Sequence, residues 1–251
     1  SLPSPRRPLS APKNIQISEK SKHSLTLEEL YLKPIIKWDE KITNRWTVSE
    51  NAAQQRLDEF VLDELQDYRD GRNFPDKANV SRLSPYLHFG QISPNTAWYR
   101  ALDASALIAN EKSLDTFLSE LGWREFSYYL LYHFPHLPHK NLQPKFDAFP
   151  WPKTQDSILR LWKSGKTGYP LVDAGMRELY STGYMHNRVR MVVGSFLVKN
   201  LLIHWHEGES WFWDCLVDAD LASNSAGWQW IAGCGADAAP VSYTHLRAHE
   251  T

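Results

Sequence analysis

The segment "DADLASNSAGWQW", residues 218–230, combines carboxylates, an amide and two indole rings within a few helical turns. Asp218, Asp220 and Asn224 could bind a polar ligand, and indole rings can form core, a stacking surface or a redox group. On a helix Trp228 and Trp230 would point about 200° apart, because each residue advances by about 100°. A helix that faces one core keeps its large apolar residues on one side. Core packing alone therefore does not account for both Trp.

A second group of candidate residues lies in "ELGWREF", residues 120–126. Glu120 and Arg124 are four residues apart, so on a helix they share a face. Their neighbours Leu121, Trp123 and Phe126 are apolar. Charges among apolar side chains indicate the wall of a pocket, where each charge needs a ligand partner. The alternative is a surface ion pair of little energetic consequence, and these residues alone leave both interpretations open.

A third group precedes the apolar segment of residues 185–204. Asn187, Arg190 and Met191 would share one face at the start of a helix, where the backbone N–H groups and the dipole favour anions. A phosphate or a reduced, anionic cofactor would suit that end. The alternative is an ordinary helix start with His186 in solvent. Taken singly, the alternative is the better interpretation.

Three further patterns carry weaker signals. In "SRLSPYL", Ser81 and Ser84 could hold a phosphate, but a helix cap at Ser84 explains the pattern equally well. The "GKT" of residues 165–167 lacks the Gly that a P-loop needs at the position of Arg160, which excludes nucleotide triphosphate hydrolysis by that motif. Three His recur in "HFPHLPH", residues 133–139, but the intervening Pro prevent a helix that would gather them. We expect an exposed turn there and no metal site.

The elements that must position these residues are helices marked by Pro and Gly. A capping box at Thr47 and Glu50, Ser-Pro starts at residues 84–85 and 93–94, and Gly stops divide the chain after about residue 45. Further helices are predicted over residues 113–134, 156–164, 170–182, 185–204, 209–217 and 225–233. No alternating strand and no βαβ rhythm occurs. The sequence therefore predicts an all-α, irregular multi-helix domain.

Composition excludes several classes of protein. Hydrophobic residues make up 42% and charged residues 23% of 251 residues, which is typical of a globular protein. The net charge of −1 provides no global attraction for nucleic acid, although a local basic patch remains open. Two Cys without metal spacing indicate a reducing compartment. No signal pattern or membrane-length apolar run occurs, so we expect a cytoplasmic monomer without a membrane partner.

Five motifs follow one another in a fixed order: "SRLSPYL", "WREF", "KTGYPLVDAGMREL", "YMHNRVRM" and "WQW" with "GADAAP". In this order the chain resembles the FAD-binding catalytic domain of the photolyase and cryptochrome family, over roughly residues 30–240. It is most similar to class I cyclobutane pyrimidine dimer (deoxyribodipyrimidine) photolyases. The resemblance implies an all-helical domain that holds a folded FAD, active in its reduced form.

The resemblance also assigns roles by motif position. The residues implied to bind FAD are Tyr68, Ser81, Leu83, Ser84, Arg124, Asn187, Arg190, Asp218, Asp220 and Asn224. Asn224 would face the flavin N5, while Arg190 and Asp218 would pair close to the ring. Val80 stands where the family commonly has Thr, which removes one hydroxyl contact.

The implied reaction is light-driven repair of DNA, in which an electron from reduced FAD splits a cyclobutane pyrimidine dimer. The residues implied to contact the lesion or DNA are Arg72, Glu120, Trp123, Arg188, Met191 and Trp230. Glu120 and Asn224 would act at the reacting groups. Trp228, Trp205 and Trp151 would form a chain that passes electrons to the flavin, whereas Trp162 and Trp98 are expected in the core.

Three alternatives to repair by a cyclobutane dimer photolyase remain. A cryptochrome-like blue-light photoreceptor would lack repair activity, but plant cryptochromes typically have Asp at the position of Asn224. A 6–4 photolyase ranks low, because that group has His at the positions of Asn187 and Met191. The third alternative is an inactive fragment.

The fragment hypothesis follows from both ends of the sequence. Residues 1–45 begin with the Pro-rich "SLPSPRRPLSAP", which predicts a linker from a missing N-terminal domain that would carry the antenna chromophore, a folate or a deazaflavin. Residues 46–240 would form the FAD-binding domain without its C-terminal part. Residues 241–251, "VSYTHLRAHET", match nothing expected of the family. We therefore expect weak FAD retention by the isolated chain.

Overall fold

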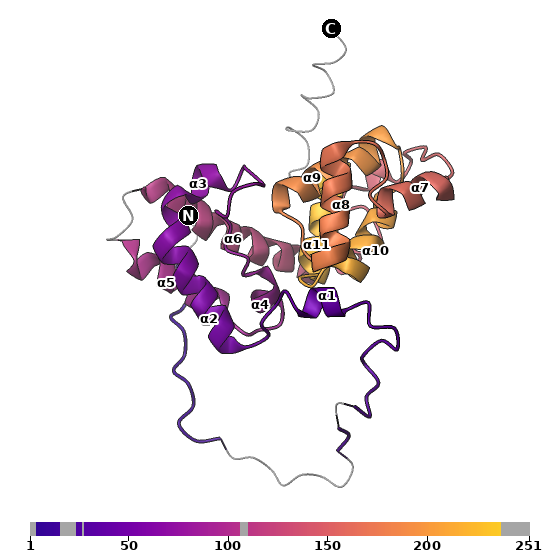
Figure 1. Cartoon of the computed structure of the whole chain (residues 1–251). Coiled ribbons are helices and arrows are strands. Elements are labelled where there is room, and N and C mark those ends of the chain that lie inside the picture. Colours follow the sequence, from indigo (N-terminus) through magenta and orange to yellow (C-terminus); the bar gives the residue numbers. More distant parts are fainter. Residues whose placement is uncertain (1–3, 16–23, 27, 106–109, 237–251) are drawn as a thin grey trace.

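The computed structural model describes residues 4–15, 24–26, 28–105 and 110–236, and every regular element among them is helical (Figure 1). The predicted all-α class is therefore confirmed. The α-helices are α1 (Glu40–Thr43), α2 (Glu50–Glu59), α3 (Tyr68–Gly71), α4 (Ser84–His88), α5 (Pro94–Asp103), α6 (Glu111–His133), α7 (Asp156–Lys163), α8 (Pro170–Thr182), α9 (Asn187–Ser195), α10 (Trp205–Cys215) and α11 (Leu221–Ala232). Shorter π or 3₁₀ segments are η1 (Phe60–Glu64), η2 (Leu65–Asp67), η4 (Pro144–Phe146) and η5 (Phe196–Asn200).

Two hydrophobic cores lie on either side of the long helix α6. The first is formed by α2, η1, α3, α5 and the first half of α6, with Phe60 and Leu57 completely buried. The second is formed by α7 to α11, with Trp162 at its centre. Helix α6 packs against α3 in the first group and against α11 in the second (Figure 1). It therefore connects the two groups and brings residues from both to one place.

Local sequence signals explain several of the helix ends. Ser93 accepts a hydrogen bond from the N–H of Thr96 at the start of α5, directly before Pro94. Helix α8 begins at Pro170 and stops at Gly183, whose φ of +67° is the left-handed conformation that favours glycine. These ends lie where the sequence predicted them.

Other predictions of where helices begin or end were wrong. Ser49, and not Thr47, caps α2 by accepting from the N–H of Ala52. Ser84 is the first residue of α4, and its hydroxyl donates to the distant Asp218 instead of capping the helix. The predicted helix 185–204 is interrupted after η5, where Leu202 has a φ of +53°.

The Pro-rich segment near the N-terminus contacts α5. The side-chain amide of Asn95 donates to the backbone carbonyl of Arg6 at 2.7 Å. The hydroxyl of Tyr99 donates to the backbone carbonyl of Pro5. The guanidinium of Arg7 lies 4.6 Å from the ring centroid of Tyr99. An extended Pro-rich backbone leaves its carbonyls without internal partners, so they are available to such donors.

Candidate functional site

Two neighbouring cavities lie where the two groups of helices meet. One has a volume of about 560 Å³ and is lined by residues of α6, α9 and α11. The other has about 360 Å³ and is lined by α3, residues 80–84, α6 and the start of α9. Their linings share Glu120, Trp123, Asn187, Arg190 and Asp218, among others, so they form parts of one continuous site. Cavities of this size bind cofactors and drug-sized ligands.

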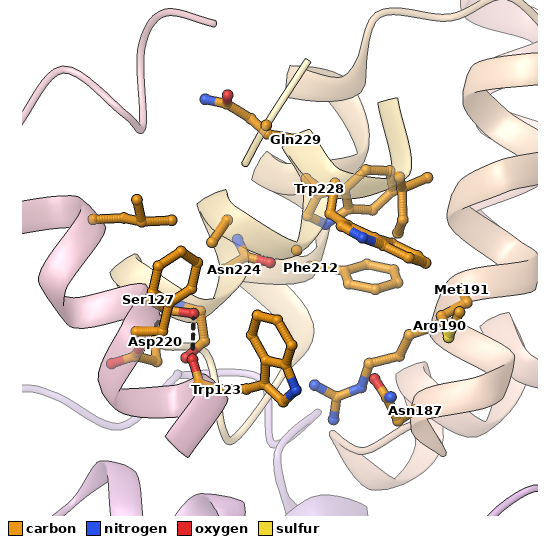
Figure 2. A pocket seen from close by; sticks show the side chains of 18 of the residues that line it. Trp123, Ser127, Asn187, Arg190, Met191, Phe212, Asp220, Asn224, Trp228 and Gln229 are labelled. Carbon is orange, nitrogen blue, oxygen red and sulfur yellow. Dashed lines mark hydrogen bonds between the residues drawn. The ribbon is translucent and has the colours of Figure 1, made fainter. Parts of the chain in front are cut away.

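The cavities gather almost every residue that the sequence assigned to the site. The larger is lined by Glu120, Trp123, Asn187, Arg188, Arg190, Met191, Asp218, Asp220, Asn224, Trp228 and Trp230. The smaller adds Tyr68, Arg72, Ser81, Leu83, Ser84 and Arg124. Figure 2 shows Trp123, Arg190, Asn224 and Trp228 directed toward the same space from three helices. Trp205 and Trp151 lie outside both linings.

Arg190 and Asp218 form the paired charges at the centre of the site. The Arg190 Nη2 donates to both carboxylate oxygens of Asp218, at 3.0 and 2.8 Å, and its Nε donates to the backbone carbonyl of Met185 at 2.8 Å. The hydroxyl of Ser84 donates to the same carboxylate at 2.6 Å. Burial opposes the charge of Arg190, but Asp218 outweighs burial and raises the pKa of the guanidinium. Arg190 is therefore charged, and these hydrogen bonds fix the orientation of both side chains.

Asn224 presents its carbonyl oxygen to the cavity. Its amide nitrogen donates to the backbone carbonyl of Glu209 at 3.1 Å, which leaves Oδ1 for a donor on a ligand. The Glu209 carboxyl accepts from the hydroxyl of Ser225 at 2.5 Å, and burial raises its pKa. An amide fixed in this way is suited to accept a hydrogen bond from an N–H of a ligand.

Glu120 and Arg124 share a face of α6, as predicted, but they do not pair with each other. Glu120 accepts from Arg72, and Arg124 donates to Glu125 at 2.7 Å. The guanidinium of Arg124 lies 4.6 Å from the ring centroid of Tyr128. Each charge therefore has a protein partner of its own, and both side chains also line the smaller cavity.

Tyr128, which sequence reasoning missed, connects α6 to the start of α11. Its hydroxyl donates to Asp220, whose other oxygen caps α11 by accepting from the N–H of Ser223 at 2.7 Å. Burial favours the neutral carboxyl, but the hydrogen bonds from Tyr128 and Ser223 outweigh burial and lower the pKa of Asp220. Tyr128 lies one helical turn after Arg124, so continuing the "WREF" stripe would have found it.

At the start of α9, His186 does not lie in solvent, which was the alternative interpretation of the sequence. His186 is buried, and its Nδ1 accepts from the N–H of Arg188 at 3.2 Å, so it is a helix cap and not a solvated residue. Burial and the charge of Arg188 lower the pKa of His186. Arg188 itself donates to the side-chain carbonyl of Asn73 at 2.9 Å, beside Arg72 and Glu120. Two arginines therefore lie together at the edge of the site.

Two of the three Trp of the proposed chain are buried, and the third is partly exposed. Trp228 lines the larger cavity and is buried, Trp205 is buried, and Trp151 is half-buried. Trp228 lies against Gly208 of α10, one turn from Trp205. Trp162, expected in the core, is fully buried and donates to the carbonyl of Val193 at 3.2 Å.

Gln229, between the two Trp of "WQW", attaches α11 to the loop that follows α6. Its amide nitrogen donates to the carbonyls of Leu137 and Lys140, at 2.6 and 2.8 Å, and its oxygen accepts from the N–H of Leu142 at 2.8 Å. Such a completely buried amide is stable only because its polar atoms are paired. It fixes the orientation of both neighbouring Trp, and nothing in the local sequence distinguishes it from a surface Gln.

Arg82 has a left-handed backbone at the wall of the smaller cavity. Its φ of +52° is unfavourable for a residue with a Cβ, and its guanidinium lies 5.5 Å from the ring centroid of Tyr184. We expect Arg82→Val to be less stable than Arg82→Gly by about 1–3 kcal/mol, the cost of a strained backbone residue. Urea unfolding of the two variants measures the difference. Equal stability would contradict the left-handed conformation.

No other class of site competes with these cavities in the residues that the structure describes. No group of three or more His, Cys, Asp or Glu there is arranged to hold a metal ion. None of the helices in those ranges is both long and apolar enough to cross a membrane. The site is a polar and aromatic cavity between helices that is partly open to solvent.

Comparisons with known proteins identify the type of domain. The family model for the FAD binding domain of DNA photolyase matches residues 117–249. The chain is 48% identical to a deoxyribodipyrimidine photo-lyase of Agrobacterium fabrum over 236 residues, which is 94% of the chain and 48% of that protein. It is also 40% identical to a cryptochrome-1 of Sinapis alba, covering 92% of the chain and 47% of that protein. The chain therefore belongs to the photolyase and cryptochrome family.

Solved structures agree with this assignment. The crystal structure of a bacterial class III photolyase from Agrobacterium tumefaciens matches with a TM-score of 0.81 and 48% identity, over 92% of the chain and 47% of that structure. A cryptochrome from Synechocystis sp. PCC6803 matches with a TM-score of 0.71 and 37% identity, over 78% of the chain and 41% of that structure. The chain thus spans about half the length of these relatives. The predicted tail at residues 241–251 lies outside the described residues.

Proposed function

We propose that the chain is the FAD-binding, catalytic part of a deoxyribodipyrimidine photo-lyase, which splits cyclobutane pyrimidine dimers in DNA with light. One observation carries the proposal. A single site joins the Arg190–Asp218 pair and Asn224, which suit a flavin, to the aromatic side chains of Trp123 and Trp230, which suit a flat base. Cofactor and substrate would therefore meet within one continuous site.

The residues present fit FAD. The free Oδ1 of Asn224 can accept from a ring N–H, and the charge of Arg190 can face the electron-rich edge of a flavin. Burial raises the pKa of Tyr68 to about 12, so its phenol stays protonated as a donor in the smaller cavity. When bound and reduced, FAD supplies the electron that opens the cyclobutane ring after excitation by light. The residues of the chain bind, orient and exclude water.

The edge of the site suits a base turned out of a DNA helix. Trp123 has 53% of its surface exposed and can stack on a flipped base, and Glu120 lies beside it on α6. Arg72 and Arg188 supply positive charge next to this edge, despite the net charge of −1. We expect Arg188, together with Arg72 beside its partner Glu120, to contribute to positioning a phosphate backbone.

Class I is the narrower proposal, and it rests on the sequence motifs alone. The solved structure at 48% identity is that of a class III photolyase, and photo-lyases of Escherichia coli and Thermus thermophilus match at 43% and 44% identity. These relatives support photolyase activity more directly than they support one class.

A cryptochrome-like photoreceptor is the second candidate, because plant cryptochromes match at 40–42% identity. Repair assays separate the two. The purified chain is loaded with FAD, reduced with dithionite and illuminated with an oligonucleotide that holds one thymine dimer, with a dark sample as control. Recovery of thymine absorbance supports repair. Bound flavin with intact dimers would favour the photoreceptor, and absence of bound flavin would favour the inactive fragment.

Trp123 provides a sharper test of substrate binding. Trp123→Leu is expected to weaken the binding of dimer-containing DNA by about 1–3 kcal/mol, the range for a base stacked on an aromatic ring. Tyr132→Leu is the matched control, because Tyr132 is an aromatic residue of the same helix that is 83% exposed and lies in neither lining. Fluorescence titration measures both. Equal losses in the two variants would contradict a stacking role for Trp123.

A further inference from the structure

The imidazole of His204 lies between two Trp of the proposed electron chain. Its ring centroid is 5.1 Å from that of Trp151 and 5.6 Å from that of Trp205, with an interplanar angle of 26° to Trp205. Trp205 is buried, whereas Trp151 is half-buried. A row of three aromatic rings therefore leads from the interior toward the surface, and its middle member is not a Trp.

The backbone fixes His204 in this position. Leu202 has a φ of +53°, which ends the preceding helical segment, and His204 then caps α10. Its Nδ1 accepts from the N–H of His206 at 3.2 Å, so the ring is held at one end by the helix start. The indole N–H of Trp205 is held separately, by the side-chain oxygen of Asn141 at 3.1 Å. The stacked arrangement of His204 and Trp205 is thus determined at both rings.

The chemical state of His204 suits the passage of positive charge. Burial lowers the pKa of its imidazole, although Glu207 acts in the opposite direction. The ring is therefore predominantly neutral near neutral pH and does not repel a cation on a neighbouring indole. Direct transfer between two rings weakens steeply with the gap between them, so an aromatic ring inside the gap improves electronic coupling.

We propose that His204 is the bridge through which an electron passes from Trp151 to Trp205. The inference rests on the proposed function, in which Trp205 has given an electron inward to Trp228. In this step the oxidised Trp205 gains one electron and becomes neutral, and Trp151 loses one electron and becomes the cation radical. A thiol from solution then returns one electron to Trp151. His204 is neither oxidised nor reduced overall, so it is a positioning residue.

Two variants distinguish the role of His204 as an electron bridge from its role as the cap of α10. His204→Asn keeps a side-chain acceptor at the cap but removes the ring, and His204→Phe keeps a ring but removes the cap. The full chain is loaded with FAD, and transient absorption records the tryptophan radical after a flash, with dithiothreitol as donor. We expect His204→Asn to slow formation of the Trp151 radical and net flavin reduction several-fold. His204→Phe should retain the rate while it lowers the thermal midpoint.

The opposite pattern would overturn the inference: a normal rate in His204→Asn and a slow one in His204→Phe would mean that only the cap matters. Unchanged rates in Trp151→Phe would overturn it as well, because Trp151 would not be the donor. Trp228→Phe tests the proposed function separately. If Trp228→Phe still reduces its flavin, the whole electron route is wrong. If Trp228→Phe loses flavin reduction but His204→Asn keeps a normal rate, only the bridge is contradicted. Near-UV circular dichroism of the FAD-free variants shows whether the aromatic side chains as a group keep their packing.

Discussion

Asp218→Ala is expected to destabilise the fold by about 3–5 kcal/mol, the range for removing one partner of a buried ion pair. Asp218 is 8% exposed and accepts hydrogen bonds from Arg190 and Ser84. Its loss leaves the guanidinium of Arg190 without a counter-charge. Since the Arg190 side chain is 22% exposed and borders the cavity, water compensates part of this cost. The measured change should therefore lie toward the lower end of the range.

Urea unfolding and FAD titration together test this expectation. The matched control is Asp58→Ala, because Asp58 pairs with Arg100 at 2.6 Å where the side chains are 39% and 32% exposed. An exposed pair contributes only about 0–1 kcal/mol, so this control should remain stable. The double variant Asp218→Leu with Arg190→Met should recover much of the stability but not FAD binding. If Asp218→Ala were as stable as Asp58→Ala, the buried pair would not be a structural requirement.

Sequence patterns predicted the helices best where the signal is complete within a few residues. The Ser-Pro start of α5 and the stop of α8 at Gly183 each depend on local backbone geometry. The helical class and the residues that line the cavities were also accessible, because the motifs occur in a distinctive order. The structure places 17 of the assigned residues around the two cavities, 11 in the larger and 6 more in the smaller.

Features that depend on distant partners could not be predicted. The local sequence predicts that Ser84 caps a helix, but its hydroxyl donates a hydrogen bond to Asp218, 134 residues away. The sequence left open whether Glu120 pairs with Arg124 on its own helix, and it gave no sign of Arg72, the partner 48 residues away. No local pattern specifies which of two chemically adequate partners is closer in space. The same reason explains why Gln229 was overlooked, since its partners lie in the loop after α6.

His caps were missed for a different reason. Ser, Thr, Asp and Asn are the usual caps, so a His before a helix is expected in solvent. His186 and His204 instead use Nδ1 to accept a backbone N–H two residues later, with nearly the same φ and ψ. His186 is buried and His204 is half-buried because of the surrounding helices. Recognising them required the packing of α9 and α10 against α11.

Gly208→Ala is expected to destabilise the fold and displace Trp228 from the cavity. A Cβ at this position would lie 2.1 Å from Cη2 and 2.4 Å from Cζ3 of Trp228, and 2.7 Å from Cδ2 of Leu197. Trp228 is only 2% exposed and packs within the second core, so its ring can move only by disturbing that packing or by shifting relative to the cavity that it lines. Ala in a helix gains about 1 kcal/mol over Gly, but overpacking a core costs about 1–3 kcal/mol and occasionally more. Because the clash is with a rigid ring, we expect the cost to exceed the gain.

Gly122→Ala is the matched control for this substitution. Gly122 lies within α6 and a Cβ there meets nothing within 4 Å, so the same change should stabilise the protein by up to about 1 kcal/mol. Urea unfolding measures the stability of both variants, and near-UV circular dichroism compares the packing of their aromatic side chains as a group. Equal stabilisation by the two substitutions would contradict the close approach of α10 and α11. That approach is what places Trp228 between the cavity and Trp205, so its loss would interrupt the proposed electron route at the first step.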